Sequence, residues 1–173
     1  MIAKLVANKN FFLKEADRFS RASKTTQMAK VLCTGWDRSL LETRTLILNS
    51  AGHEVHQARS QGEVVSACDQ QHFDVAVIGQ TVSNRMKRVI FSFVKEHCRD
   101  VKVLELYQPH VGKALDGADS WLEVPADIPS DLAERVGELV QLAEKQKREN
   151  RKTTKDDRIQ LPSLNNESSS PAE

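Results

Sequence analysis

The stretch that decides the fold is Phe73-Asp74-Val75-Ala76-Val77-Ile78-Gly79-Gln80. It is an apolar, largely β-branched run that follows the polar residues 69–72 and closes with glycine. A parallel strand covered by helices on both faces has such a continuous apolar run, because neither face points to water. We therefore expect a central strand here, with its carboxyl end at Gly79. Open sheets of this kind keep their chemistry at that end of the strands.

The rest of the chain predicts four more strands and several helices. Short apolar runs indicate further strands within 31–34, 53–58, 101–107 and 117–125, and the second of these is the least apolar and therefore an edge strand. Helical periodicity covers 38–50, 61–70, 84–98 and a segment that begins after Pro129. Residues 108–116 leave room for only a short helix. Five strands alternating with five helices predict an α/β fold, a three-layer, doubly wound, five-stranded parallel sheet with the βα unit repeated five times.

Polar residues also have expected places in two of these helices. In the third helix we place Arg85, Lys87, Arg88 and Lys95 on the outer, solvent face. In the last helix Ser130 is the expected N-cap, with acidic residues in the first turn that follows it.

Composition changes at both ends divide the chain into three parts. Residues 1–27 are expected to be a flexible basic leader, and they either form an amphipathic arm or precede a native start at Met28. Residues 28–145 are expected to be the single folded domain. Residues 146–173 mix both charges and then become rich in Ser, Asn and Glu, so we expect a disordered polar tail. Its basic residues alternate with acids and lack aromatic neighbours, which favours a solvated helix end over a nucleic-acid patch.

Charge and cysteine content exclude several classes of function. The 25 Lys and Arg nearly balance the 24 Asp and Glu, so no nucleic-acid or membrane partner is expected. Cys33, Cys68 and Cys98 are odd in number and form no CxxC pair, which favours buried thiols in a reducing cytoplasm over disulfides. His53 and His56 lie three apart on a strand and point to opposite faces, so we expect no metal site there. No cofactor is expected.

Three segments resemble a known family. Ser50-Ala51-Gly52-His53-Glu54-Val55 resembles the "EAGYEV" junction of response-regulator receiver domains, the CheY-like members of the flavodoxin-like fold. Residues 73–78 resemble their "PDLVLLD" third strand, and residues 117–122 resemble their "GADDYL" turn. With the order of elements, the resemblance covers roughly residues 30–145.

The resemblance implies phosphoryl transfer to an aspartate at the end of the third strand, with Mg²⁺ held by an acidic pair after the first strand. The matching positions in this sequence do not supply these groups. They are Gly79 or Gln80 at the phosphoacceptor; Gly35 and Trp36, followed by Asp37, at the acidic pair; Glu105 and Leu106 at the Ser/Thr switch; and Val124 at the lysine before proline. The resemblance therefore implies a degenerate pseudo-receiver.

Three classes of function follow. The first is a receiver-like module of bacterial signal transduction that acts by phosphorylation-independent protein–protein interaction, with an unidentified signalling protein or as a homodimer through the last helix and its neighbouring strand. The second is a domain that binds a small ligand or metal at the carboxyl edge of the sheet. Its candidates are Thr34, Gly35, Trp36, Asp37, Gly79, Gln80, Thr81, Glu105 and Glu123, although such glycines also serve turns and such acids also face solvent. The third, an enzyme, lacks a nucleophile, base or HExxH arrangement in the sequence.

Overall fold

A computed structural model describes residues 28–125 and 130–156 of the chain. Five parallel strands form one sheet in the order β2-β1-β3-β4-β5, with β3 in the centre. The strands are β1 (Lys30–Thr34), β2 (Glu54–Ala58), β3 (Val75–Ile78), β4 (Lys102–Tyr107) and β5 (Ser120–Glu123). The helices are α2 (Arg38–Ser50), α3 (Gln61–Gln70), α4 (Asn84–His97) and α5 (Ser130–Asp156). The predicted sheet, its central strand and the edge position of β2 are confirmed.

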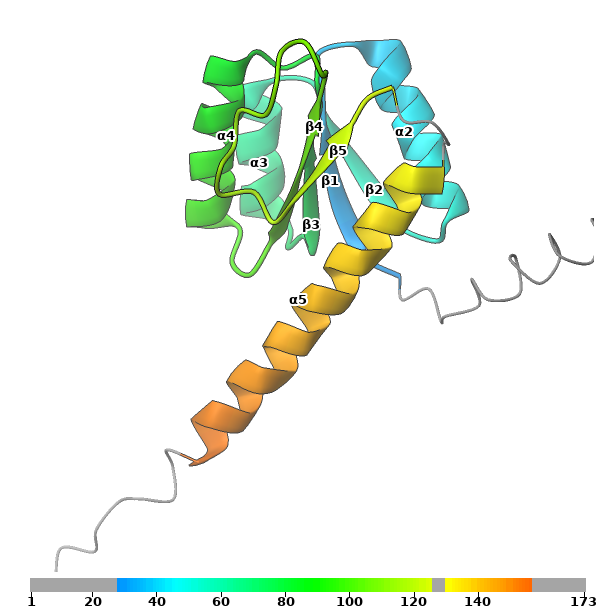
Figure 1. The fold of residues 1–173 in the computed structure, drawn as a ribbon. Helices are drawn as coiled ribbons and strands as arrows, with labels where there is room; N and C mark the ends of the chain where they lie inside the picture. The colour runs from blue at the N-terminus through cyan, green and yellow to red at the C-terminus, as the bar shows by residue number, and fades with distance from the viewer. Residues whose placement is uncertain (1–27, 126–129, 157–173) are drawn as a thin grey trace, which may run out of the picture.

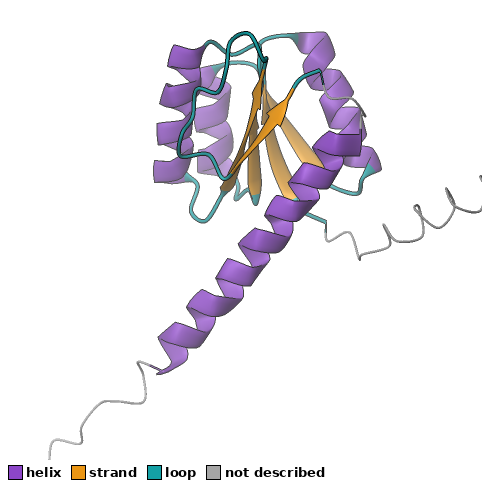
Figure 2. Ribbon diagram, viewed as in Figure 1, coloured by secondary structure: helices purple, strands orange, loops and turns teal. Residues whose placement is uncertain are grey.

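Helices cover both faces of the sheet, as Figure 1 and Figure 2 show. On one face, α3 and α4 enclose a core that includes Phe73, Ile78, Ile90 and Val94. On the other face, α2 and α5 enclose a second core, whose largest members are Leu41, Leu48, Leu104, Leu106 and Leu139. Successive residues of β3 enter the two cores alternately, and all four are fully buried. The continuous apolar run at β3 therefore has the predicted cause.

Local signals place the helix ends. The Asp37 carboxylate accepts a hydrogen bond from Leu40 N at 2.9 Å and caps α2. Ser60 caps α3 in the same way through Glu63 N, at 3.2 Å. Gly52 follows the end of α2 with a φ of 88°, the left-handed conformation that glycine adopts without a steric penalty.

The connection between β4 and β5 differs from the expectation. Residues 108–119, all described, contain turns and no helix, so the alternation of five strands with five helices is wrong at this point. The physical reason lies in the hydrogen bonds of this segment. The buried carboxylate of Glu105 accepts hydrogen bonds from the backbone N–H groups of Ala114 and Leu115, which a continuous helix would use internally.

The last helix is longer than expected. It continues to Asp156, past the predicted boundary between domain and tail at 145–146. Lys102 Nζ donates to Gln146 Oε1 at 2.8 Å, and Lys147 Nζ lies 2.9 Å from Asp74 Oδ1. These contacts hold the helix to the sheet beyond its apolar stripe, and Figure 1 shows α5 continuing past the sheet. Residues 1–27 and the rest of the expected tail, 157–173, lie outside the described residues.

The cysteines also correct a prediction. Cys68 and Cys98 form a disulfide, with their Cα atoms 5.7 Å apart, so the expectation of three free thiols is wrong. The sequence gives no sign of it because 30 positions separate the two residues, and the fold brings the ends of α3 and α4 together. Cys33 remains a free, buried thiol, and burial raises its pKa to about 11, against a smaller opposing effect of Arg44.

The two histidines of the second strand region do not converge. His53 is buried just before β2, and neither ring nitrogen has a hydrogen-bond partner. His56 lies against the Phe73 ring and within hydrogen-bond distance of Gln71. In the part of the chain that the structure describes, no three His, Cys, Asp or Glu residues group as a metal site would need. Likewise, none of the described helices has the length and apolar character to cross a bilayer.

Candidate functional site

The candidate site begins at Gly79, the residue that follows β3. Its N–H donates to the carbonyl oxygen of Thr34 at 2.9 Å, which ties the ends of β3 and β1 together. A Cβ atom at Gly79 would lie only 2.5 Å from that oxygen and 2.8 Å from Nη1 of Arg44. The first distance is to backbone, which cannot move aside without disturbing β1. The position therefore has no space for a side chain in this arrangement.

Arg44 of α2 fills the space beside Gly79. Its side chain is buried, with 6% of the residue exposed. Nη2 donates to Oε1 of Gln80, the residue after Gly79, while Nη1 has no hydrogen-bond partner. Nη1 also lies 3.4 Å from the Cβ position of Gly35. Arg44 therefore fills the space between Gly35 and Gly79.

The electrostatics of Arg44 are unusual for a buried cation. Among the described residues, no carboxylate lies within ion-pair distance of its guanidinium. Burial lowers the pKa of Arg44, and the nearby Cys33 and Asp37 act in the opposite direction. Arginine nevertheless stays protonated in proteins. A positive charge is thus placed at the carboxyl edge of the sheet.

The turn between β1 and α2 is tied to the loop after β3. Trp36 N and Asp37 N both point at Oγ1 of Thr81, at 3.0 and 3.4 Å. The Asp37 carboxylate is engaged at the start of α2, and 38% of the Trp36 residue is exposed. The structure therefore brings together Gly35, Trp36, Asp37, Gly79, Gln80 and Thr81 as the sequence predicts. Thr34 lies beside them, although its buried hydroxyl has no partner.

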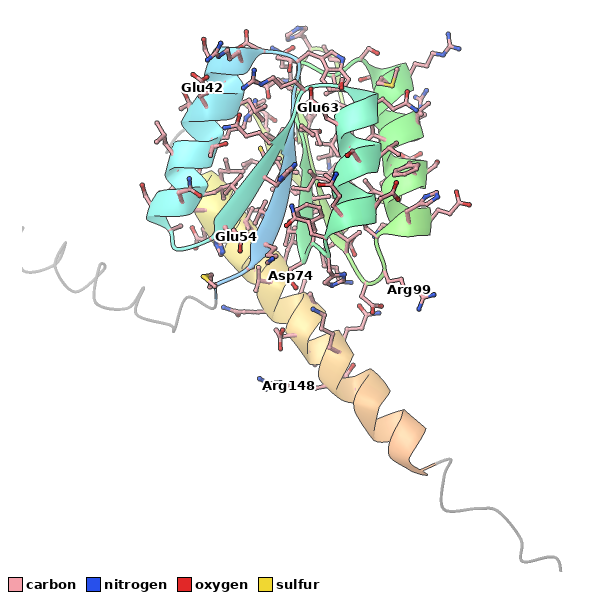
Figure 3. The ribbon with its side chains drawn as sticks, turned by 180° about the vertical axis from the view of Figure 1, so that it is seen from behind. Glu42, Glu54, Glu63, Asp74, Arg99 and Arg148 are labelled. Carbon is pink, nitrogen blue, oxygen red and sulfur yellow. A yellow bond between two sulfur atoms is a disulfide. The ribbon has the colours of Figure 1, made fainter. Side chains whose placement is uncertain are left out.

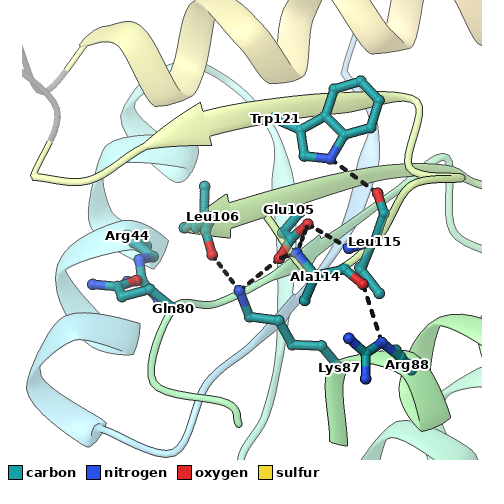
Figure 4. Close-up of polar contacts among 9 residues, drawn as sticks. All are labelled: Arg44, Gln80, Lys87, Arg88, Glu105, Leu106, Ala114, Leu115 and Trp121. Atoms are coloured by element: carbon teal, nitrogen blue, oxygen red, sulfur yellow. Dashed lines mark hydrogen bonds and ion pairs between the residues drawn. The ribbon is translucent and has the colours of Figure 1, made fainter. Parts of the chain in front are cut away.

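Glu105 belongs to a second polar group. It is completely buried, so the alternative that the acids of this edge face solvent is wrong for Glu105. Its Oε1 lies 2.8 Å from Nζ of Lys87, a residue of α4 that is only 2% exposed. The same Nζ donates to the carbonyl oxygen of Leu106 at 2.8 Å. Figure 4 shows Lys87 and Glu105 together, apart from Arg44 and Gln80.

Backbone groups complete this second site. Ala114 N donates to the Glu105 carboxylate at 2.9 and 3.1 Å, and Leu115 N donates to its Oε2 at 2.9 Å. The carbonyl oxygen of Leu115 in turn accepts from Nε1 of Trp121 in β5, at 3.0 Å. A buried carboxylate with a cation and amide donors is fully satisfied. The network joins α4, β4, the following loop and β5.

The remaining predicted positions lie outside both groups. Val124 follows β5 and packs against the core under α5, with a cis peptide bond to Pro125. Glu123 is exposed and accepts a hydrogen bond from the Tyr107 hydroxyl at 3.3 Å. Of the predicted candidates, Glu123 therefore does not join the group around Gly79.

Sequence reasoning missed the two buried cations. Arg44 was not singled out, and the outer-face placement of Lys87 is wrong. The sequence nevertheless contains a sign that both cations are buried. Arg44 lies between Leu41 and Leu48 on the apolar stripe of α2, and Lys87 continues the stripe of Ile90 and Val94 on α4. A cation on an otherwise apolar stripe indicates a buried partner or site.

Comparisons with known proteins define the fold. No protein-family model matches the chain, and no curated protein sequence matches it either. Among solved structures, a CheY-like receiver domain protein from Methanospirillum hungatei is 19% identical with a TM-score of 0.57, covering 69% of this chain and 99% of its own. TrrA, a response regulator from Thermotoga maritima in complex with Mg²⁺ and BeF, is 17% identical with a TM-score of 0.56, covering 65% and 99%. The fold is that of response-regulator receiver domains.

One larger neighbour matches only in part. NtrX from Brucella abortus, in complex with ADP, is 14% identical with a TM-score of 0.63, and the match covers 81% of this chain. The chain corresponds to about a third of that protein, since 32% of NtrX is covered.

Proposed function

We propose that this protein is a receiver-like module of bacterial signal transduction that works through protein–protein contacts without being phosphorylated. The observation that carries the proposal is the buried Arg44 guanidinium beside Gly79. In the receiver fold, the end of the third strand is where a carboxylate accepts the phosphoryl group. Here that position is a glycine with no space for a Cβ atom.

The residues near Gly79 also disfavour the binding of Mg²⁺. Magnesium binds oxygen ligands, mainly carboxylates and water. The residues after β1 are Gly35 and Trp36, and the Asp37 carboxylate caps α2. The Arg44 guanidinium lies between Gly35 and Gly79, and its positive charge would repel a divalent cation bound beside them. The guanidinium itself links α2 to the loop after β3 through Gln80.

The second polar group supports a fixed conformation. A phosphorylated receiver changes through a hydroxyl residue near the end of its fourth strand, where this chain has Glu105 and Leu106. The Glu105 carboxylate is already bonded to Lys87 and to two backbone amides. Any movement of this segment would break a buried ion pair, which is costly. The proposed module therefore presents one surface permanently.

The proposed partner is a signalling protein or a second copy of this chain. For a second copy, the proposed surface is α5 with β5, because β5 ends the described sheet and α5 packs beside it. The proposed compartment is the cytoplasm.

The test uses a small phosphodonor. The purified protein is incubated with acetyl phosphate and Mg²⁺, and its intact mass is measured. We expect no added phosphoryl group, whereas a typical receiver treated in parallel gains one. A stoichiometric, Mg²⁺-dependent gain in mass would contradict the proposal. Sedimentation of the same sample at several concentrations tests the dimer.

One observation favours a second function, the binding of a small anionic ligand. Nη1 of Arg44 is a buried donor without a partner, and an oxyanion would satisfy it. The positive charge of Arg44 disfavours a metal ion at the same place. Calorimetric titration with inorganic phosphate tests this candidate, with Arg44→Leu as the matched control. Saturable binding that the substitution abolishes would support it, and no binding to either protein would reject it.

A further inference from the structure

The opposite edge of the domain holds a pair of sulfur atoms that the proposed function does not use. Cys68 lies in the last turn of α3, and Cys98 directly follows α4. Both helices end where the next strand begins, so the disulfide lies at the amino edge of the sheet, away from Gly79. It is a covalent link between two neighbouring helices on the same face of the sheet.

A hollow gives access to this disulfide. It has a volume of about 280 Å³ and is lined by residues 68–72 and 97–99, which include both cysteines. Cys68 is partly exposed, whereas Cys98 is 4% exposed, so Cys68 is the more accessible residue of the pair. Figure 3 shows Arg99 at this edge of the domain, beyond the end of α4.

Polar groups around the hollow suit thiol chemistry. His72, His97 and Arg99 line it together with two amide side chains and the carboxylate of Asp69, which acts against a thiolate. Cationic and hydrogen-bonding groups stabilise a thiolate, the form in which a cysteine leaves or attacks in disulfide exchange. Cys33 has the opposite environment, since it is fully buried and its pKa is raised to about 11. Cys33 is therefore an unreactive internal reference.

We propose that Cys68 and Cys98 are a reversible redox site, opened by a small thiol or dithiol that enters this hollow. The reductant's thiolate attacks Sγ of Cys68, a mixed disulfide forms, and Cys98 leaves as a thiolate that takes up a proton. A second thiolate, from the same dithiol or from another molecule of the thiol, then attacks the reductant's sulfur in the mixed disulfide and releases Cys68 as a thiolate that takes up a proton. Two electrons and two protons reach the protein, and the reductant becomes a disulfide. This step rests on the cytoplasmic compartment proposed above, where a disulfide serves as a redox sensor more often than as a structural bond.

The consequence of reduction follows from the position of the bond. The disulfide holds the ends of α3 and α4 together, while the opposite end of α4 is fixed by Lys87 and Glu105. Opening the disulfide separates the ends of α3 and α4 that carry the cysteines, and it leaves the buried ion pair between Lys87 and Glu105 in place. The change is therefore confined to the surface formed by residues 66–72 and 94–99.

The experiment counts accessible thiols in the folded protein. The full chain is treated with iodoacetamide in native buffer, before and after incubation with millimolar reduced glutathione, and the labelled peptides are identified by mass spectrometry. We expect no labelling before reduction and labelling of Cys68 and Cys98, but not Cys33, after it. Oxidised glutathione should reverse the change. Reduction should lower the thermal midpoint by about 10 °C, because a loop of some thirty residues is no longer closed.

Two results would overturn the redox site. Labelling of Cys68 and Cys98 without reductant would mean that the disulfide does not form, and labelling only after denaturation would mean that it is a permanent structural bond. Cys33→Ala should keep the glutathione-dependent change of the wild type, whereas Cys68→Ser should have the lower midpoint with or without glutathione. Hydrogen exchange provides an independent readout: reduction should increase it at 66–72 and 94–99 and leave the region around Gly79 unchanged. None of these readouts depends on phosphorylation, so they do not test the proposed function.

Discussion

The buried ion pair between Lys87 and Glu105 gives a prediction whose size follows from the structure. Substitution of Lys87 by Met leaves a carboxylate buried with two amide donors and no cation. Substitution of Glu105 by Leu removes more, because Lys87 and the N–H groups of Ala114 and Leu115 all lose an acceptor. Breaking one partner of a buried pair costs about 3–5 kcal/mol. We expect the loss of unfolding free energy to fall in that range for Lys87→Met, and to lie at or above its upper end for Glu105→Leu.

The double substitution shows whether the pair itself is responsible. With both charges removed, only the two amides lack an acceptor, at about 1–3 kcal/mol each. The double variant should therefore lose less stability than the sum of the two single losses, by at least about 2 kcal/mol. Urea unfolding followed by circular dichroism measures all four proteins. A domain of this size has about 5–15 kcal/mol in total, so each single variant should unfold at much lower urea concentration.

Two results would refute this reasoning. Single losses below about 1 kcal/mol would mean that water reaches the pair, because exposed ion pairs contribute that little. Losses that add within about 0.5 kcal/mol would mean that the two charges do not interact. A matched surface control is Arg38→Met, whose partner Glu42 is also exposed.

Two further predictions concern single sites. Gly79→Ala should destabilise the domain by about 1–3 kcal/mol in urea unfolding, because the new methyl group meets the Thr34 carbonyl. The control is Gly62→Ala in α3, where no atom lies within 4 Å of the new methyl group, and it should stabilise the domain by about 0.5 kcal/mol. Equal effects of the two substitutions would contradict the crowding at Gly79. His53 is buried and its pKa is lowered by burial, so protonation favours the unfolded chain and stability should fall as the pH decreases below about 6.5. Unfolding free energies at pH 8 and pH 5.5 should differ less in His53→Leu than in the wild type, and an unchanged difference would reject this role.

Much of the fold could be predicted because its signals are local. The apolar run at Phe73–Gln80 indicated a strand buried on both faces, and Asp37 and Ser60 cap their helices through contacts three residues away. The parallel sheet followed from alternating elements and short connections, and the lower apolar content of residues 53–58 placed their strand at an edge. The length of α5 was not predicted, because past the apolar stripe its contact with the sheet is an ion pair between Lys147 and Asp74, which lie far apart in the sequence.

The candidate site could be predicted only in part. Proximity of Gly35, Trp36 and Gly79 follows from their places at the carboxyl ends of neighbouring strands. The roles of Arg44 and Lys87 depend on side chains that reach across elements 36 and 18 positions apart. A charge pattern alone assigns such residues to solvent, because most cations are exposed. The disulfide was missed for the same reason, since its two cysteines meet only in the folded chain.

The most direct test of the proposed function uses Trp36 as a reporter. Trp121→Phe leaves Trp36 as the single tryptophan, and its partly exposed indole lies in the turn beside Gly35. Fluorescence is followed while Mg²⁺ is titrated to millimolar concentration, first alone and then with fluoroberyllate, the ligands bound by the structural neighbour TrrA. We predict no change with either. Saturable quenching by Mg²⁺, or by fluoroberyllate only when Mg²⁺ is present, would show a working phosphoryl site and contradict the phosphorylation-independent function.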